Sequence, residues 1–215
     1  MVHNSEMITV HHLDNSRSQR ILWLLEELGL DYKIVFHKRE KSGFAPASLK
    51  AAHPLGKAPV VDLDGQLVAE SGAAVELITQ RYGGGRLMPA ADSQDYVRYI
   101  EWLHYPEGSV SLATSMTLFG RVFGVDNAIY KSYVQSQVDL HLGYIGSQLS
   151  GREFLIGTDL TAADIQLTFT LQAARRSKLL EPYTDLSAYL ERMEARPAYL
   201  RAIDKGGPFT LRIGG

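Results

Sequence analysis

The first 82 residues alternate between two kinds of apolar pattern. Short apolar runs at 7–13 and 31–37 are typical of β-strands, whereas the stretch between them, 16–29, repeats leucine and isoleucine at the 3.6-residue spacing of an α-helix. A strand, a helix and a second strand in this order predict that the two strands pair in parallel. A short, weaker helical pattern follows at 44–52.

A hairpin comes next. Two short apolar runs, 58–63 and 66–70, are separated by Asp64-Gly65, a dipeptide typical of tight β-turns. A third helical pattern begins at Ser71, which is a good N-cap residue. The N-terminal segment therefore predicts a small α/β domain with the element order βαβαββα.

The rest of the chain predicts only helices. Residues 83–92, GGGRLMPAAD, are rich in glycine, proline and alanine and indicate a linker. Helical patterns follow at 93–108, 109–123 and 127–149, with a break expected at Pro106-Glu107-Gly108. Further along, Thr161 and Asp164 have the spacing of a capping box at a helix start. The predicted fold class is thus α/β followed by an all-α domain.

Composition limits the possible functions. The chain has a net charge of −2 and no long basic run, which argues against nucleic acid or an anionic membrane as partner. It has no cysteine, so disulfides, thiolate metal sites and cysteine nucleophiles are excluded. No apolar run approaches the roughly 20 residues of a membrane helix, and the N-terminus lacks a secretory signal pattern. A cytoplasmic location is expected.

The junction before the hairpin is a candidate ligand site. Pro59 stands at the start of a predicted strand, although proline has no N–H to give to a sheet. If the Ala58–Pro59 bond is cis, the backbone N–H and C=O of Ala58 have no sheet partner and can bind an extended peptide by strand addition. The alternative is a simple turn proline at the start of a strand.

The pair Glu70-Ser71 adds a second candidate. Free N–H groups and the helix dipole at the start of a helix favour a carboxylate, which the Ser71 hydroxyl can also bind, and Glu70 can accept from an ammonium group. Lys57 is suited to a second carboxylate. The alternatives are that Ser71 only caps its helix and that Glu70 and Lys57 are solvated.

The order and spacing of these features resemble the cytosolic glutathione transferases over nearly the whole chain. The resemblance rests on "HPLGKAPVV", the "ES" pair at 70–71, the linker, the helical half and "GTDLTAAD" at 157–164, while "NSRSQRILWLLEELGL" is similar to a bacterial and fungal branch. It implies a thioredoxin-like domain at 1–82, a linker at 83–92 and a helical domain at 93–215. It also implies glutathione as co-substrate, a homodimer and no metal.

The resemblance also implies residue roles. The γ-glutamyl end of glutathione would meet Glu70 and Ser71, the cysteinyl backbone Ala58 beside Pro59, and the glycyl carboxylate Lys57. His53 would assist or serve only the structure. The nucleophile-activating hydroxyl falls on Ser16, with Asn15 and Ser18 as rivals. The resemblance places three residues of the helical domain in the pocket for an apolar electrophile: Tyr105, Met116 and Phe119.

The expected activity is attack of the glutathione thiolate on an apolar electrophile, with reduction of organic hydroperoxides as a neighbouring possibility. The alternative is a non-catalytic protein of the same fold that binds glutathione or a hydrophobic ligand. The adjacent His11 and His12 do not indicate a metal site, because neighbouring strand residues point to opposite faces of a sheet.

Overall fold

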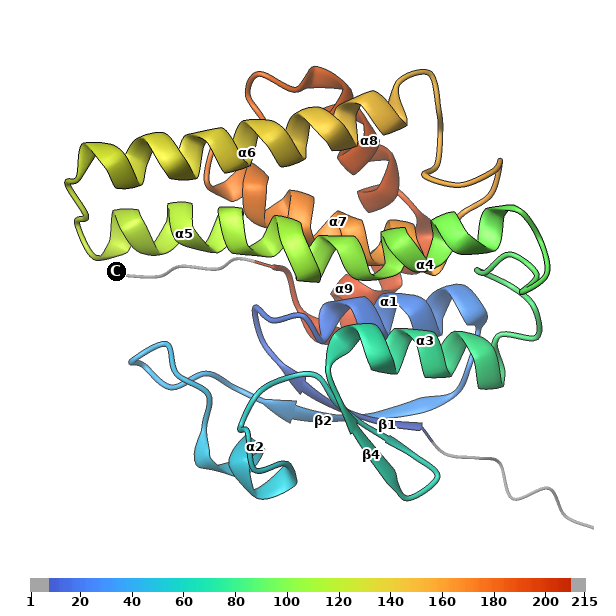
Figure 1. Cartoon of the computed structure of the whole chain (residues 1–215). Coiled ribbons are helices and arrows are strands. Elements are labelled where there is room, and N and C mark those ends of the chain that lie inside the picture. Colours follow the sequence, from blue (N-terminus) through green and yellow to red (C-terminus); the bar gives the residue numbers. More distant parts are fainter. Residues whose placement is uncertain (1–7, 210–215) are drawn as a thin grey trace, which may run out of the picture. The chain divides into compact units, whose positions relative to one another are not determined.

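The computed structural model describes residues 8–209 and divides into two compact units (Figure 1). The first unit combines residues 8–84 with residues 196–209, and the second contains Gly85–Ala195. The first is built on a mixed sheet and the second is entirely helical.

The sheet of the first unit has the strand order β2-β1-β3-β4. β1 pairs in parallel with β2 and antiparallel with β3, and β3 and β4 form an antiparallel hairpin. The parallel pair and the hairpin at Asp64-Gly65 are therefore confirmed. The strands are β1 Ile8–Leu13, β2 Tyr32–His37, β3 Val60–Leu63 and β4 Gln66–Ala69.

Four helices accompany this sheet, and α1 is the central one. α1 and α3 lie on one face of the sheet and α2 on the other (Figure 1). α1 ends at Gly29, whose φ of 62° gives the left-handed cap that glycine adopts most readily. The helices are α1 Gln19–Leu28, α2 Ala47–Ala52, α3 Ser71–Tyr82 and α9 Pro197–Gly206.

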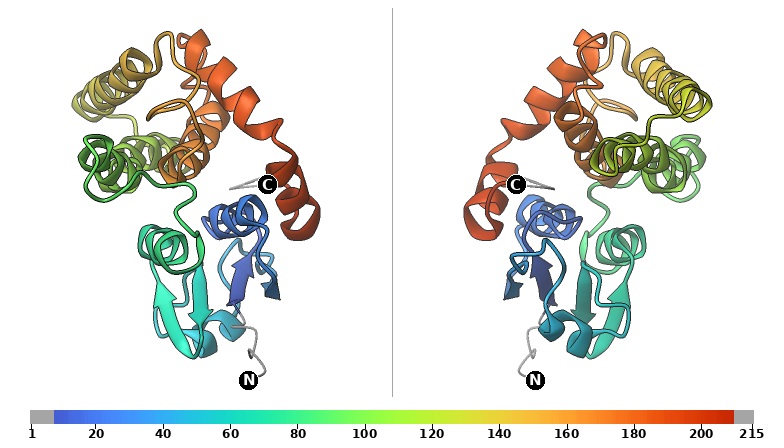
Figure 2. Two further views of the ribbon diagram at one scale, coloured as in Figure 1. Left: turned by 90° about the vertical axis from the view of Figure 1, so that its right-hand side faces the viewer. Right: turned by 90° about the vertical axis from the view of Figure 1, so that its left-hand side faces the viewer.

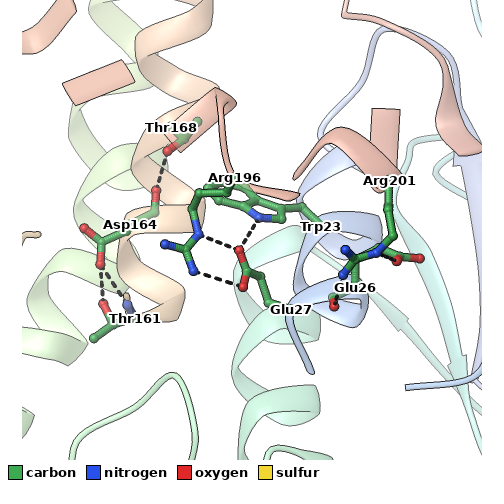
Figure 3. A network of polar contacts seen from close by, with 8 residues as sticks. All are labelled: Trp23, Glu26, Glu27, Thr161, Asp164, Thr168, Arg196 and Arg201. Carbon is green, nitrogen blue, oxygen red and sulfur yellow. Dashed lines mark hydrogen bonds and ion pairs between the residues drawn. The ribbon is translucent and has the colours of Figure 1, made fainter. Parts of the chain in front are cut away.

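The position of α9 corrects the predicted domain division. The sequence places all residues from 93 to 215 in one helical domain, but residues 196–209 belong to the first unit and α9 packs against α1. The reason is a set of ion pairs between helices far apart in the sequence. Glu27 accepts from Arg196 Nε at 2.7 Å and from Trp23 Nε1 at 2.9 Å (Figure 3).

Glu26 makes the second connection between α1 and α9. Its side chain is 8% exposed and accepts hydrogen bonds from Arg201 Nε at 2.8 Å, from the Tyr32 hydroxyl at 2.7 Å and from Lys205 Nζ. The neighbouring carboxylates of Glu26 and Glu27 thus both bind cations carried by the C-terminal segment. α9 therefore covers a second face of α1, and the apolar spacing at 16–29 does not predict that this face is buried.

The second unit begins with one long, bent helical stretch. α4, a π-helical turn η1 and α5 follow one another without interruption, although the sequence predicts a break at Pro106-Glu107-Gly108. In the π turn the Ser111 N–H donates to the Pro106 carbonyl, five residues earlier. This wider turn lets the helix continue past the proline. The elements are α4 Asp95–Tyr105, η1 Pro106–Val110, α5 Ser111–Val122, α6 Ala128–Leu149, α7 Ala162–Arg176 and α8 Thr184–Glu194.

The N-terminus of α7 carries the predicted capping box. Asp164 is fully buried and accepts from the Thr161 N–H at 2.9 Å, the Thr161 hydroxyl at 2.8 Å and the Tyr189 hydroxyl at 2.7 Å (Figure 3 shows the two contacts with Thr161). Asp164 also accepts from the Leu155 N–H at 2.9 Å, which ties the preceding loop to the helix.

Within residues 8–209, no helix combines the length and apolarity needed to cross a bilayer.

The contacts of Glu26 predict how stability depends on pH. Burial by itself raises the pKa of this carboxyl, but the hydrogen bonds from Lys205, Tyr32 and Arg201 outweigh burial and lower the pKa below its ordinary value of 4.5. A carboxyl with a lowered folded pKa stabilises the fold above its unfolded pKa, and this contribution is lost as the pH falls through the folded value. We therefore expect part of the acid destabilisation of this protein to come from Glu26.

Glu26→Gln tests this expectation in urea unfolding between about pH 7 and pH 3. Because Arg201 and Lys205 are half exposed, we expect the variant to lose only about 1–2 kcal/mol at pH 7 and to show a weaker fall of stability with acid. Glu40→Gln, at an exposed loop position, is the matched control. A Glu26→Gln curve parallel to that of the wild type over the whole range would contradict the assignment.

Candidate functional site

The strand register brings several loop ends to one edge of the sheet, the edge at which β1 and β4 end and β3 begins. Val60 pairs with His11 on one side and with Ala69 on the other. The turn after β1, the residues before β3 and the residues after β4 therefore leave the sheet at the same edge (Figures 1 and 2). These segments contain Ser16, the Ala58–Pro59 junction and the Glu70-Ser71 pair.

The Ala58–Pro59 peptide bond is cis, as the interpretation of this junction requires. Pro59 is buried, while Ala58 lies partly exposed two residues before the strand. Within residues 8–209, no protein group forms a hydrogen bond with the backbone N–H or C=O of Ala58. Both groups are thus free to pair with the backbone of an extended ligand.

Glu70 turns the chain into α3 with an unusual backbone. Its φ is 81°, in the region that side-chain-bearing residues rarely adopt, and its carbonyl accepts the Ala74 N–H at 3.0 Å. Glu70 therefore occupies the N-cap position, and Ser71, which the sequence predicts as the cap, is the first helical residue. The Glu70 side chain is exposed and the Ser71 side chain is buried.

A charged residue that the sequence analysis did not assign to the site reaches Ser71. Arg20 of α1 is 1% exposed, and its Nη1 donates to Ser71 Oγ at 3.0 Å. A guanidinium carries a permanent positive charge, and the start of α3 offers free N–H groups and the positive end of the helix dipole. Together they make this corner of the sheet edge suited to a carboxylate. No sequence signal separated this arginine from a structural one.

Ser16 lies in the turn between β1 and α1. The helix begins at Gln19, with Ser18 in the N-cap position, so Ser16 precedes the helix by a short turn. The Ser16 side chain is 8% exposed, and its Oγ lies 2.7 Å from Ser18 Oγ. Of its two rivals, Ser18 is fully buried, and Asn15 has a φ of 53° and accepts from Arg39 Nη2 through its carbonyl.

Histidines flank this turn. His12 is 1% exposed; its Nδ1 lies 2.9 Å from Ser18 Oγ and its Nε2 2.9 Å from the carbonyl oxygen of Gly206. His11 points to the other face of β1, where its Nδ1 lies 3.1 Å from His37 Nε2. Burial lowers the pKa of His12 and of His11. Among the described residues, no group of three or more histidine, aspartate or glutamate side chains is arranged to hold a metal ion.

The remaining predicted residues of the first unit lie before the cis junction. Lys57 is exposed, and within residues 8–209 it forms no ion pair or hydrogen bond through its side chain. His53 follows α2, and its Nδ1 accepts the Leu55 N–H at 3.3 Å, which gives His53 a role in the local turn. The two roles weighed for His53, in binding and in structure, both stay open.

The predicted electrophile residues belong to the second unit. The Tyr105 hydroxyl lies 2.7 Å from His141 Nδ1 of α6, and burial raises the Tyr105 pKa to about 12. The Met116 side chain is partly exposed, and Phe119 is 47% exposed and stacks on Phe123. A pocket of about 560 Å³ between α5 and α6 is lined by none of the three predicted residues. Their role with an electrophile therefore stays a prediction.

Comparison with known proteins identifies the family. Residues 5–80 match the N-terminal domain of glutathione S-transferases, and residues 122–200 match a C-terminal domain of the same family. Glutathione S-transferase 3 of Schizosaccharomyces pombe is 35% identical over an aligned length of 221 residues, gaps included. The alignment covers 96% of this chain and 91% of that protein.

Comparison with solved structures supports the same family. A glutathione S-transferase of Actinobacillus pleuropneumoniae superposes with a TM-score of 0.88 at 37% identity, covering 95% of each chain. A sphingomonad glutathione S-transferase, solved in complex with glutathione, has the same fold, with a TM-score of 0.76 at 23% identity over 93% of this chain and 98% of that one. The chain is a member of the glutathione S-transferase family.

Proposed function

We propose that this protein binds glutathione at the sheet edge of its first unit and transfers it, as the thiolate, to an apolar electrophile. The observation that carries the proposal is the convergence of Ser16, the unpaired Ala58 backbone and the Arg20–Ser71 pair at one edge. Membership of the glutathione S-transferase family supports the same ligand.

The chemistry of each group fits one part of glutathione. The γ-glutamyl carboxylate is assigned to the start of α3, where the Ser71 hydroxyl, held by Arg20, can donate to it. The adjacent ammonium is assigned to Glu70. The cysteinyl N–H and C=O pair with the Ala58 backbone as an added strand. Lys57 is assigned to the glycyl carboxylate, and its exposure limits its contribution.

This placement of the backbone directs the cysteinyl sulfur toward the turn after β1, where we assign it to Ser16. A hydrogen bond to a charged group contributes about 1.5–3 kcal/mol, and one pKa unit corresponds to about 1.4 kcal/mol. A hydroxyl donated to the thiolate would therefore lower the thiol pKa by roughly one to two. The thiolate, which is the attacking species, would be populated at neutral pH.

The second substrate is assigned only by class. The sulfur attacks an apolar electrophile, and reduction of an organic hydroperoxide by the same thiolate is the neighbouring activity. Tyr105, Met116 and Phe119 stay the candidate residues on the electrophile side. The homodimer and the cytoplasmic location expected from the sequence also stay predictions.

Ser16→Ala tests the nucleophile assignment. With a chromogenic aryl halide as electrophile, we expect kcat to fall at least about tenfold while the KM for glutathione changes little, because the sulfur is the one atom of glutathione that we assign to this hydroxyl. Asn15→Gly, which keeps the positive φ, tests the rival residue in parallel. Equal turnover and equal thiolate absorbance in Ser16→Ala would remove Ser16 from this role.

Ser71→Ala tests the carboxylate site. The variant removes a donor to the ligand and leaves the buried Arg20 without this acceptor, so calorimetry should show glutathione binding about tenfold weaker. Ser42→Ala, at an exposed position of the same unit, should bind like the wild type. Unaltered affinity in Ser71→Ala would speak against the assignment.

Glu70→Gly tests whether the backbone of Glu70 is strained. A side chain at a φ of 81° costs about 1–3 kcal/mol, so glycine should raise the free energy of unfolding by about 1 kcal/mol even though it loses more entropy on folding. Ala73→Gly, inside α3, should instead lower it by about 1 kcal/mol. Urea unfolding measures both. A destabilised Glu70→Gly would show that the turn stores no strain.

The same assays separate the enzyme from a non-catalytic binder. Turnover of an aryl halide or of cumene hydroperoxide, with a rate above the solution reaction, supports the enzyme. Glutathione binding without any turnover would favour the binder, and absence of glutathione binding would overturn both.

A further inference from the structure

The protonation of His12 can be read from its partners. Nε2 lies 2.9 Å from the carbonyl oxygen of Gly206, and a carbonyl oxygen only accepts, so Nε2 carries a hydrogen. In a neutral imidazole Nδ1 is then bare and accepts. The group 2.9 Å from Nδ1 is the Ser18 hydroxyl, which therefore donates to His12.

This assignment fixes the direction of the next hydrogen bond. The single proton of the Ser18 hydroxyl is used on His12, so the 2.7 Å contact between the two serine hydroxyls requires Ser16 to donate to Ser18. The Leu13 N–H donates to the same Ser18 oxygen at 3.2 Å. The Leu13 carbonyl oxygen lies 3.3 Å from Ser18 Oγ, a longer contact than the 2.9 Å to His12 Nδ1, so the Ser18 proton is assigned to His12. The proton of Ser16 thus points inward. Ser16 Oγ also accepts the Ser18 N–H at 3.2 Å, which leaves one lone pair with which Ser16 can accept from an incoming ligand.

An acceptor at this position matches a thiol rather than a thiolate. We infer that Ser16, Ser18 and His12 form a relay that carries the thiol proton of bound glutathione to Nδ1 of His12. The inference rests on the proposed function, because it requires the sulfur to lie at Ser16. His12 and Ser18 do not touch the substrate and act through Ser16.

The transfer conserves atoms and charge. The S–H bond breaks and its electron pair stays on sulfur; the thiol proton joins Ser16 Oγ, the Ser16 proton moves to Ser18 Oγ, and the Ser18 proton forms a new N–H bond at His12 Nδ1. All three hydrogen bonds are now reversed, so Ser16 donates to the thiolate. After product release the proton returns along the same chain to solvent.

The surroundings of His12 suit both protonation states. Burial, and to a smaller extent His37 of β2, lower the His12 pKa, which keeps the ring neutral before the ligand arrives. The Gly206 carbonyl and the Asp14 carboxylate act in the opposite direction and stabilise the cation once it forms. Gly206 is the last residue of α9, where the negative end of the helix dipole also favours a cation.

The close approach of α9 to His12 favours glycine at position 206. A Cβ there would lie 2.5 Å from Leu22 Cδ1, 2.8 Å from Gln19 Oε1 and 3.1 Å from His12 Cε1. Any other residue would displace the ends of the Leu22 and Gln19 side chains and crowd the imidazole. The contact that fixes the tautomer of His12 is therefore built into the packing of α9 on α1.

The decisive experiment observes His12 in the unmodified protein. Imidazole nitrogen shifts of ¹⁵N-histidine-labelled protein are recorded near pH 7 alone, with glutathione and with S-methylglutathione, which binds without a thiol proton. We expect His12 to become an imidazolium with glutathione and to stay neutral with S-methylglutathione. A His12 that stays neutral while the thiolate absorbance of bound glutathione appears would overturn the relay.

Variants give an independent readout. His12→Asn keeps an acceptor for the Ser18 hydroxyl but cannot hold a proton, and Ser18→Ala interrupts the chain. In both we expect the pKa of bound glutathione to rise by about one and kcat near neutral pH to fall about tenfold, with the KM for glutathione little changed. His11→Asn, on the opposite face of β1, should change neither quantity.

The outcomes separate the relay from the function on which it rests. If Ser16→Ala loses the thiolate while His12→Asn and Ser18→Ala keep it with a normal pH profile, Ser16 acts alone and the relay is wrong. If the wild-type protein forms no thiolate at all, the proposed function fails and the relay fails with it.

Discussion

The pairing of β1 with β3 is the constraint on which the candidate site depends. Because these strands run antiparallel with His11 opposite Val60, the end of one and the start of the other share an edge. β4 returns to the same edge through its pairing with β3. A shift of one residue would turn the site side chains to the wrong faces and separate the turn carrying Ser16 from the Ala58–Pro59 junction.

α1 connects this edge to the rest of the first unit. Its first turn supplies Arg20 to Ser71. Its last turns supply Glu26 to cations of α9 and Glu27 to Arg196, the N-cap residue of α9. The helix is buried on nearly all sides, so apolar packing and charge pairing hold it from different directions. Arg20, a candidate group for the ligand carboxylate, is thereby positioned by a helix that is buried on nearly all sides.

Local patterns predicted much of this structure. The hairpin at Asp64-Gly65, the capping box of Thr161 and Asp164, and the cis junction at Ala58–Pro59 each depend on residues close together in the chain, and all three are present. The uninterrupted helix through Pro106 was not predicted, because a π turn has no clear sequence signal.

Long-range contacts were beyond such patterns. Arg20 and Ser71 are 51 residues apart, and His12 and Gly206 are 194 residues apart. Nothing in the periodicity of either segment indicates that they meet. The assignment of Ser16 from the sequence is therefore a statement about one hydroxyl, while its hydrogen-bonded neighbours become visible only in the folded chain.

The return of α9 has a consequence for biosynthesis. The unit that carries the candidate glutathione site is discontinuous, since its N-terminal portion ends at Gly84 and its last helix begins at Pro197. A nascent polypeptide would thus expose one side of α1 until α9 has been synthesised, instead of closing its first domain early as is common. A truncated product ending before Gly206 would lack the carbonyl that holds the His12 ring.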